Sequence, residues 1–453
     1  MKKALLFTIV IIAAFANAKA QNWTKVEGPL PYINFLKFSD TDPNVLYVGS
    51  DSLPTDISRG DIEFPFVGWG YMKSVDKGAT FAPAGLAGRA VYWVHEAGSG
   101  NLYASVRFMS TGGVVRSTDN GATWDLDYVA CEGSDQVSSI VKITENGVDK
   151  LLASAVNTNS GLKVIESDLS ACFPVANMNV QSRRLIRSKV NPNLIFMAGD
   201  DGSQGHVLRS YDNGKTWLSD ESGLEGLRIN AVLQSSKYPN YIYAGADQVL
   251  FNNIAIGKGI YMSLDTGKTW QALGAPDAQV FDLVEHPTNP EFMAAACGSY
   301  GVFVSGNAGQ FWEQHLSGLP ADSLVTRVAI PDEPATAQGV KVLAGVQGAG
   351  LYKSDYITSG VRESAAINAL EVFPNPISDR FNVSFIAEAA QPCRLTIYDP
   401  MGGELYAESF SSTSTGSQVR TFAPGTKLTA GAYFIELRVG ARRMYHKIMV
   451  RNE

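Results

Sequence analysis

Acidic, amide and aromatic side chains gather in two long segments of this 453-residue chain, Asp51 to Trp69 and Asp247 to Gly257. Aromatic rings can stack on a sugar or peptide while carboxylates and amides fix its orientation, so both segments suit ligand recognition. A shorter polar segment adds two aspartates and a histidine. The candidate ligand-binding residues are Asp56, Asp61, Glu63, Phe66, Trp69, Asp200, Asp201, His206, Phe251 and Asn252.

The same carboxylates are compatible with a second chemistry, glycoside hydrolysis, which needs two carboxyl groups about 5–9.5 Å apart. Other catalytic patterns are absent from the sequence. The five histidines are scattered, and there is no metal-ligand spacing, nucleophile elbow, phosphate-binding loop or dinucleotide fingerprint. We therefore expect no metal and no cofactor, and we assign no catalytic residue. A third interpretation is that the aromatic segments only cover the end of a channel.

The elements that must position these segments are repeats. The signature S-x-D-x-G-x-T followed by Trp or Phe begins at Ser74, Ser117, Ser210 and Ser263. A degenerate copy, in which Asn307 replaces the Asp, begins at Ser305. Fainter copies stand at Ser167-Asp168 and Ser354-Asp355. The copies recur at roughly 40 to 55 residues, the length of one four-stranded propeller blade.

Each residue type in the repeat has a structural purpose. The Asp can accept hydrogen bonds from nearby backbone N–H groups, the Gly can adopt a conformation that a side chain disfavours, and the aromatic ring can pack between sheets. Repetition also favours a scaffold, because one active site does not need several copies. The residues predicted to be structural are Asp76, Asp119, Asp212, Asp265, Trp124, Trp217, Trp270 and Trp312.

An apolar strand followed by a Pro-, Asn- or Gly-rich turn precedes each copy. These inner strands are expected to start near Ile33, Ala90, Val137, Leu185, Ile229, Val280 and Val325. The seventh repeat stops at Asp355 without its outer strand, whereas Asn22–Val26 looks like an outer strand without a blade. We predict an all-β fold in which a seven-bladed β-propeller is closed by the N-terminal strand, with Trp23 in the place of the repeat Trp.

Composition changes at both ends of the repeats. Two lysines, an apolar stretch and Ala18-Lys19-Ala20 predict a signal peptide over 1–20. The propeller is expected over 21–356, a polar linker over 357–369, and a small Ig-like β-sandwich with alternating strands over 370–453. No later segment is apolar over the roughly 18 residues that a membrane span needs.

The repeats resemble the BNR or Asp-box family, which includes sialidases, xyloglucan-cleaving hydrolases, sortilin-type receptors and photosystem II assembly factors. The C-terminal motifs are FPNP at Phe373, IYD with a following GG, L-x-x-G-x-Y at Leu428, and K-x-x-V at Lys447. They resemble the type A sorting domain of the type IX secretion system of Bacteroidetes. The resemblance implies that the secretion machinery is a partner, and that the protein passes through the periplasm after Sec export to become secreted or surface-bound.

The net charge bears on the class of partner, and the cysteines bear on whether the protein contains a disulfide. The net charge is −7 with no Lys/Arg stripe, so a nucleic-acid partner is not expected. Of the four cysteines, Cys131 and Cys172 could form a disulfide between adjacent blades, or all could be buried free thiols.

Three functions are consistent with the sequence. The leading hypothesis is a recognition protein that binds a glycan or an extracellular protein through the loop face, where second and third strands are joined. The alternatives are a secreted glycoside hydrolase that uses Asp or Glu on that face, and an assembly factor acting on another exported protein.

Overall fold

The computed structural model describes most of both predicted domains. The described residues are 23–28, 31–50, 70–108, 111–134, 137–155, 161–175, 180–202, 204–219, 221–246, 249–251, 254–256, 258–275, 278–310, 312–335, 339–354, 370–373, 377, 380–387, 389–398, 404–414, 416–424, 428–429, 431–440 and 442–450. The predicted signal peptide, the predicted linker and the long segment from Asp51 to Trp69 lie outside them.

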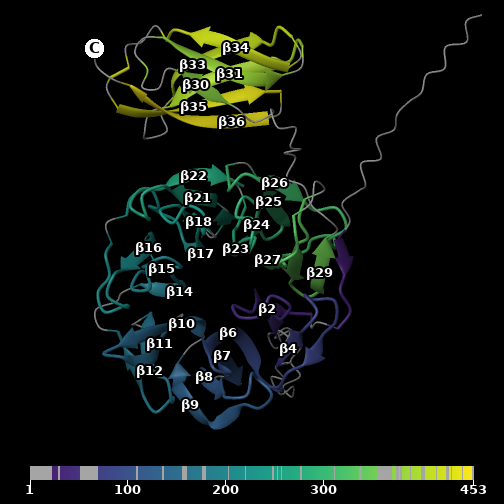
Figure 1. Ribbon diagram of the computed structural model, residues 1–453, viewed down its shortest axis with the longest axis vertical. Coiled ribbons are helices and arrows are strands. Elements are labelled where there is room, and N and C mark those ends of the chain that lie inside the picture. The colour runs from purple at the N-terminus through teal and green to yellow at the C-terminus, as the bar shows by residue number, and fades with distance from the viewer. Residues whose placement is uncertain are drawn as a thin grey trace, which may run out of the picture.

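Seven antiparallel sheets of the described residues form a ring around a central axis (Figure 1). The inner strand of each sheet contacts the inner strand of the next, and β27 (Val325–Ala329) contacts β2 (Ile33–Phe38) to complete the circle. The predicted seven-bladed propeller is therefore confirmed.

The first three blades each have four strands that follow one another in the chain. Blade 1 contains β2, β3 (Leu46–Ser50), β4 (Tyr71–Ser74) and β5 (Ala82–Pro83). Blade 2 contains β6 (Ala90–Gly98), β7 (Asn101–Phe108), β8 (Thr111–Ser117) and β9 (Asp125–Ser134). Blade 3 contains β10 (Val137–Glu145), β11 (Val148–Ala155), β12 (Leu162–Glu166) and β13 (Cys172–Pro174).

The next three blades depart from this pattern in two places. Among its described residues, blade 4 has three strands, β14 (Gln181–Arg187), β15 (Ile195–Asp200) and β16 (Gly205–Ser210), and Leu218 forms a single antiparallel bridge with Arg209. Blade 5 has β17 (Ile229–Gln234), β18 (Ile242–Ala246), β21 (Gly259–Ser263) and β22 (Gln271–Gly274), with a separate hairpin of β19 (Val249–Phe251) and β20 (Ile254–Ile256) between its middle strands. Blade 6 has β23 (Asp282–Glu285), β24 (Met293–Ala296), β25 (Val302–Ser305) and β26 (Glu313–His315).

The seventh blade is completed by the N-terminal strand. It consists of β27, β28 (Leu343–Val346), β29 (Gly350–Ser354) and β1 (Trp23–Lys25), and Trp23 lies opposite Ser354. Trp23 is buried at 4% exposure among apolar residues of blades 6 and 7. The predicted closure by the first strand is thus confirmed.

Small residues on the second strands let neighbouring blades approach closely near the axis. A Cβ atom at Gly49 of β3 would lie 2.5 Å from the carbonyl oxygen of Val91 in the next blade. A Cβ atom at Gly345 of β28 would lie 3.0 Å from a methyl carbon of Ile33 in blade 1. These strands are fully buried, which explains why they read as short continuous apolar runs rather than alternating ones.

A disulfide joins Cys131 of β9 to Cys172 of β13, with the two Cα atoms 5.4 Å apart. It connects the outer strands of blades 2 and 3, as the first of the two sequence-based interpretations proposed. Cys297 and Cys393 are free and buried.

The C-terminal part is a small Ig-like sandwich of two antiparallel sheets. One sheet contains β30 (Glu371–Phe373), β31 (Phe381–Ala387) and β34 (Gly416–Phe422). The other contains β33 (Glu404–Ser411), β32 (Pro392–Tyr398), β35 (Gly431–Val439) and β36 (Arg442–Val450). Its core includes Phe381, Phe385, Leu395 and Ile435.

Candidate functional site

The repeated S-x-D motif forms the turn between the third and fourth strands of a blade, and its carboxylate is occupied within that turn. In blade 2, Asp119 accepts hydrogen bonds from the Ser117 hydroxyl at 2.7 Å, the Thr123 amide at 2.8 Å and the Thr123 hydroxyl at 2.6 Å. These bonds, led by that from the Thr123 hydroxyl, lower the pKa of Asp119 to about 2. The carboxylate is therefore ionised, and both of its oxygens accept hydrogen bonds within the turn.

The same bonds recur in the turns of Asp76, Asp212 and Asp265. In the degenerate copy, Asn307 accepts a hydrogen bond from the Ser305 hydroxyl at 3.0 Å. Trp124 reaches back to the preceding blade, where its indole donates to the Ala84 carbonyl at 3.2 Å. Trp217, Trp270 and Trp312 also pack on apolar residues of their own and the preceding blade.

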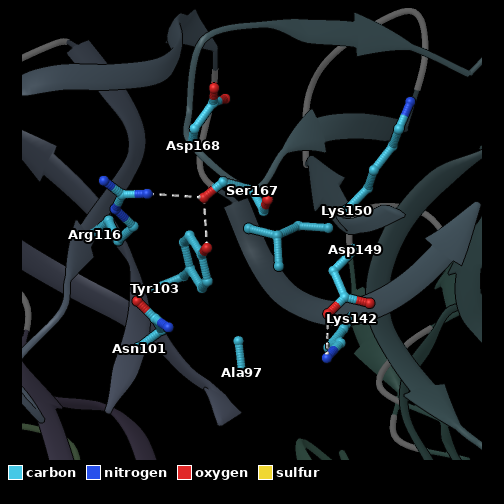
Figure 2. Close-up of a pocket in the computed structure, with 10 residues that line it drawn as sticks. Ala97, Asn101, Tyr103, Arg116, Lys142, Asp149, Lys150, Ser167 and Asp168 are labelled. Atoms are coloured by element: carbon cyan, nitrogen blue, oxygen red, sulfur yellow. Dashed lines mark hydrogen bonds and ion pairs between the residues drawn. The ribbon is translucent and has the colours of Figure 1, made fainter. Parts of the chain in front are cut away.

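Long side chains from one blade clamp the S-x-D turn of the next. The Arg209 guanidinium donates to the Thr266 carbonyl at 3.1 Å, and Arg116 donates to the Ser167 carbonyl at 3.3 Å. The Tyr103 hydroxyl donates to that same Ser167 oxygen at 2.5 Å (Figure 2). The pocket in Figure 2, of about 210 Å³ between blades 2 and 3, is thus formed around a contact that holds two blades together.

Most of the predicted ligand-binding residues lie outside the described part of the chain. These are Asp56, Asp61, Glu63, Phe66, Trp69 and Asn252. The backbone of Phe251 lies in the hairpin of β19 and β20, which stands in the chain between the second and third strands of blade 5. The loop-face site on these residues stays a prediction.

The remaining three predicted residues lie together on the loop face, at the turn between β15 and β16. The His206 ring contacts the Glu221 carboxylate at 2.6 Å through Nδ1 and Asp201 at 3.3 Å through Nε2. The hydrogen bond with Glu221 raises the pKa of His206 above its usual range. Asp200 is buried and pairs with Arg183 at 3.0 Å. Neither aspartate is therefore a free, exposed carboxylate.

The larger cavity, of about 560 Å³, lies on the propeller axis and is lined by the inner strands of all seven blades. Its lining reaches the carboxyl ends of these strands: it runs from Arg184 to Lys189 in blade 4, past the end of β14, and over the whole of β23 in blade 6. That end is the turn face, where first strands turn into second strands. It is opposite the loop face, because Asp200 pairs with Gln181 at the start of β14, whereas Ile195 pairs with Arg187 at its end.

Charged side chains from separate blades meet at the deep end of this axial cavity. Arg184 of blade 4 forms an ion pair with the buried Asp282 of blade 6 and lies over the Trp93 ring of blade 2, 4.8 Å from its centre. Arg327 of blade 7 donates to the carbonyl oxygens of Asn34 at 2.5 Å and Thr326 at 2.6 Å. Burial, together with the charge of Arg184, lowers the pKa of Arg327 to about 10, although Asp282 acts in the opposite direction.

The acidic residues nearer the cavity mouth cap turns of the preceding blade. Glu96 accepts hydrogen bonds from the Ser39 hydroxyl at 2.7 Å and the Tyr47 hydroxyl at 2.9 Å in blade 1. Glu285 accepts hydrogen bonds from the Ser236 amide at 3.0 Å and the Ser235 hydroxyl at 3.1 Å in blade 5. The two glutamates therefore occupy equivalent structural positions.

Sequence reasoning missed the axial residues. The signal that could have found them is the interruption of short apolar inner strands by charges, as in Arg184-Leu185-Ile186-Arg187 and Asp282-Leu283-Val284-Glu285. Within the described residues there is no cluster of three or more His, Cys, Asp or Glu side chains that could bind a metal ion. The same part of the chain contains no helix long and apolar enough to cross a membrane.

Comparison with known proteins identifies the C-terminal part and the fold of the rest. Residues 371–451 match the secretion system C-terminal sorting domain. YCF48 from Cyanidioschyzon merolae is 13% identical, with a TM-score of 0.51, and the match covers 74% of this chain and 98% of that one. YCF48 bound to a D1 peptide is 14% identical, with a TM-score of 0.51 and coverage of 76% and 97%.

An ancestral GH74 enzyme is 12% identical, with a TM-score of 0.54, and the match covers 94% of this chain and 63% of that enzyme. No curated protein matches the chain. At these identities the structural likeness shows the fold alone. The sorting domain indicates secretion through the type IX system to the cell surface or the extracellular space. The chain is therefore an exported protein that combines a seven-bladed β-propeller with a C-terminal secretion sorting domain.

Proposed function

We propose that this exported protein is a recognition module that binds a glycan or an extracellular protein without chemical turnover. The axial cavity supports the proposal, because its volume of about 560 Å³ falls in the range of ligand sites and a rigid ring surrounds it. We place the binding site there, at the turn face. One propeller of similar fold, YCF48, holds a D1 peptide, so a propeller of this kind can accept a peptide ligand.

The observation that carries the proposal is the state of the four carboxylates that line the cavity. Asp40 pairs with Lys37, Asp282 pairs with Arg184, and Glu96 and Glu285 cap neighbouring turns. A glycoside hydrolase needs one carboxyl group poised as an acid and a second as base or nucleophile. Because each of these carboxylates already accepts a bond from the protein, the cavity favours binding over hydrolysis.

The competing proposal is a glycoside hydrolase on the loop face. It would rely on Asp56, Asp61 and Glu63, which lie outside the described residues. Asp200 and Asp201, the two candidate aspartates that are described, are paired with Arg183 and His206, which disfavours them as acid and base. The predicted assembly-factor role is a special case of protein recognition and shares the test below.

The organisation of the chain forms part of the same proposal. We assign 1–20 to a cleaved signal peptide, 21–356 to the propeller, 357–369 to a linker and 370–453 to the sorting domain. The S-x-D turns are proposed to be scaffold of the Asp-box type, because their carboxylates and aromatic side chains bond within and between blades.

The test uses the chain from residue 21 to 453 on a glycan array and a peptide array, together with a hydrolysis screen of soluble polysaccharides. We expect saturable binding to one ligand class and no release of reducing ends. A thermally unfolded sample is the control for nonspecific adsorption. Release of sugars by the folded chain would contradict the proposal and favour the hydrolase.

A further inference from the structure

The axial cavity carries more positive charge than the rest of the protein would suggest. Six cationic and four acidic side chains line it, a surplus of two positive charges in a chain whose net charge is −7. Lys142 is neutralised by Asp149, 2.6 Å away and outside the lining, and His95 is buried with a pKa lowered by that burial to about 4. One surplus positive charge then remains. Because Lys37 pairs with Asp40 and Lys189 with Glu285, it is carried by the arginines.

Two arginines of the lining are bonded to backbone carbonyls rather than to a carboxylate, as far as the described residues show. Arg187, near the mouth, donates to the carbonyl oxygens of Pro192 at 2.6 Å and Lys142 at 3.2 Å. Arg327, at the deep end, donates to Asn34 and Thr326. Glu96 has no cationic partner among the described residues, but it accepts several hydrogen bonds from blade 1 and is oriented toward that turn.

At the deep end one carboxylate faces two guanidinium groups. Asp282 pairs with Arg184 and also influences Arg327, while the two arginines repel each other. When the only carboxylate near a half-buried cation already pairs with another cation, a second anion stabilises that cation strongly. The reason is that Coulomb attraction is stronger where water is scarce. A ligand carboxylate would turn two cations and one anion into two balanced pairs.

The walls between these charges favour a peptide over a sugar. Leu36, Val141, Leu233 and Val284 present aliphatic groups to the cavity. The two aromatic rings of the lining, those of Phe35 and Trp93, are both buried, pack on each other at 5.1 Å, and Arg184 lies over Trp93. Sugar recognition usually relies on an open aromatic face, which the described lining does not provide.

We propose that the axial cavity takes an acidic side chain of an extended peptide segment, whose carboxylate pairs with Arg327 while its apolar neighbours contact the aliphatic wall. The inference rests on the proposed function, because it specifies the ligand of the same cavity. Charge-assisted pairs between carboxylate and guanidinium are strong and directional, so Arg327 would determine how far the ligand enters the cavity. Arg187 would assist entry at the mouth.

The test is fluorescence anisotropy with the chain from residue 21 to 453 and a library of labelled octapeptides in matched pairs, which differ only by a central Glu or Gln. We expect the Glu member of the binding pairs to bind at least about tenfold more tightly, which corresponds to about 1.4 kcal/mol. Arg327→Gln should abolish that preference. Asp282→Asn should increase it, because it removes the internal competitor for the two arginines.

Lys268→Gln is the matched control, since it removes one exposed positive charge of blade 5 outside the cavity and should leave the preference unchanged. Thermal unfolding of each variant shows whether it is folded, and Arg187→Gln supplies a second, milder variant at the mouth. Equal binding of Glu and Gln peptides would overturn this inference but leave the proposed function standing. Preference for oligogalacturonate over every peptide would replace the peptide with an acidic sugar. Failure of all these probes and of the arrays to bind would overturn both.

Discussion

Trp23 lies opposite Ser354 in the sheet of the seventh blade, so the first described strand completes a blade formed by the last part of the propeller. The strand pair covers the open edge of β29, and the Val26 amide adds a hydrogen bond to the Leu351 carbonyl at 2.8 Å. The ring is therefore held closed by hydrogen bonds between the two ends of the propeller sequence.

Trp23→Ala should reduce the free energy of unfolding by about 3–5 kcal/mol, because it empties a buried aromatic site at the closure. Urea denaturation monitored by circular dichroism gives the value. Thr24→Ala, on the exposed position of the same strand, should have little effect. Equal stability of the two variants would mean that the closure does not stabilise the ring.

Asp119→Asn should lower thermal stability at neutral pH, because the amide has one acceptor oxygen and cannot accept at both positions that the carboxylate uses. Folding lowers the pKa of Asp119 to about 2, so its contribution is present above the unfolded value of about 3.9 and is lost as the pH falls through about 2. The melting temperatures of wild type and variant should therefore converge in acid. Asp322→Asn, at an exposed aspartate outside these turns, is the control and should melt close to wild type at neutral pH.

Removal of the disulfide between Cys131 and Cys172 should cost up to about 4 kcal/mol, the chain-entropy value for a loop of this length. The measurement compares wild type with the Cys131→Ser, Cys172→Ser double variant, each with and without dithiothreitol. Dithiothreitol should destabilise wild type and leave the double variant unchanged. If dithiothreitol does not change the stability of wild type in a denaturant titration, the disulfide adds no stability.

His206 should titrate above its usual pKa of about 6.5, because the Glu221 carboxylate stabilises the imidazolium. Its contribution to stability is then complete below about pH 6.5 and is lost as the pH rises through the raised folded value. NMR titration of the ring proton measures this pKa directly, and Glu221→Gln should lower it. A wild-type value at or below 6.5 would contradict the described ion pair.

The fold was predictable because its signals are local. The start of the inner strand was predicted correctly at Ile33, Ala90, Val137, Ile229 and Val325. It was displaced in blade 4, where β14 begins at Gln181 rather than Leu185, and in blade 6, where β23 begins at Asp282 rather than Val280. In blade 4 the strand starts with polar residues that carry no apolar pattern.

The axial site was not predictable by the same means. Arg184, Asp282 and Arg327 come from blades 4, 6 and 7, and only the closed ring brings them together. Each reads in the sequence as a charge on a short strand, with nothing that links it to the charges of the other two blades. The predicted loop-face residues were conspicuous because they form clusters in the sequence, whereas the axial residues form a cluster only in space.

The most direct test of the central claim, that a ligand occupies the axial cavity, is calorimetric titration of the strongest array ligand into a variant with a filled cavity. Leu233→Trp places an indole in the cavity from a half-buried wall position, and Val190→Trp adds the same group at an exposed site on the turn face. We predict that Leu233→Trp weakens binding at least about tenfold, or about 1.4 kcal/mol, while Val190→Trp binds like wild type. Wild-type affinity in folded Leu233→Trp would contradict the assignment of the axial cavity as the binding site.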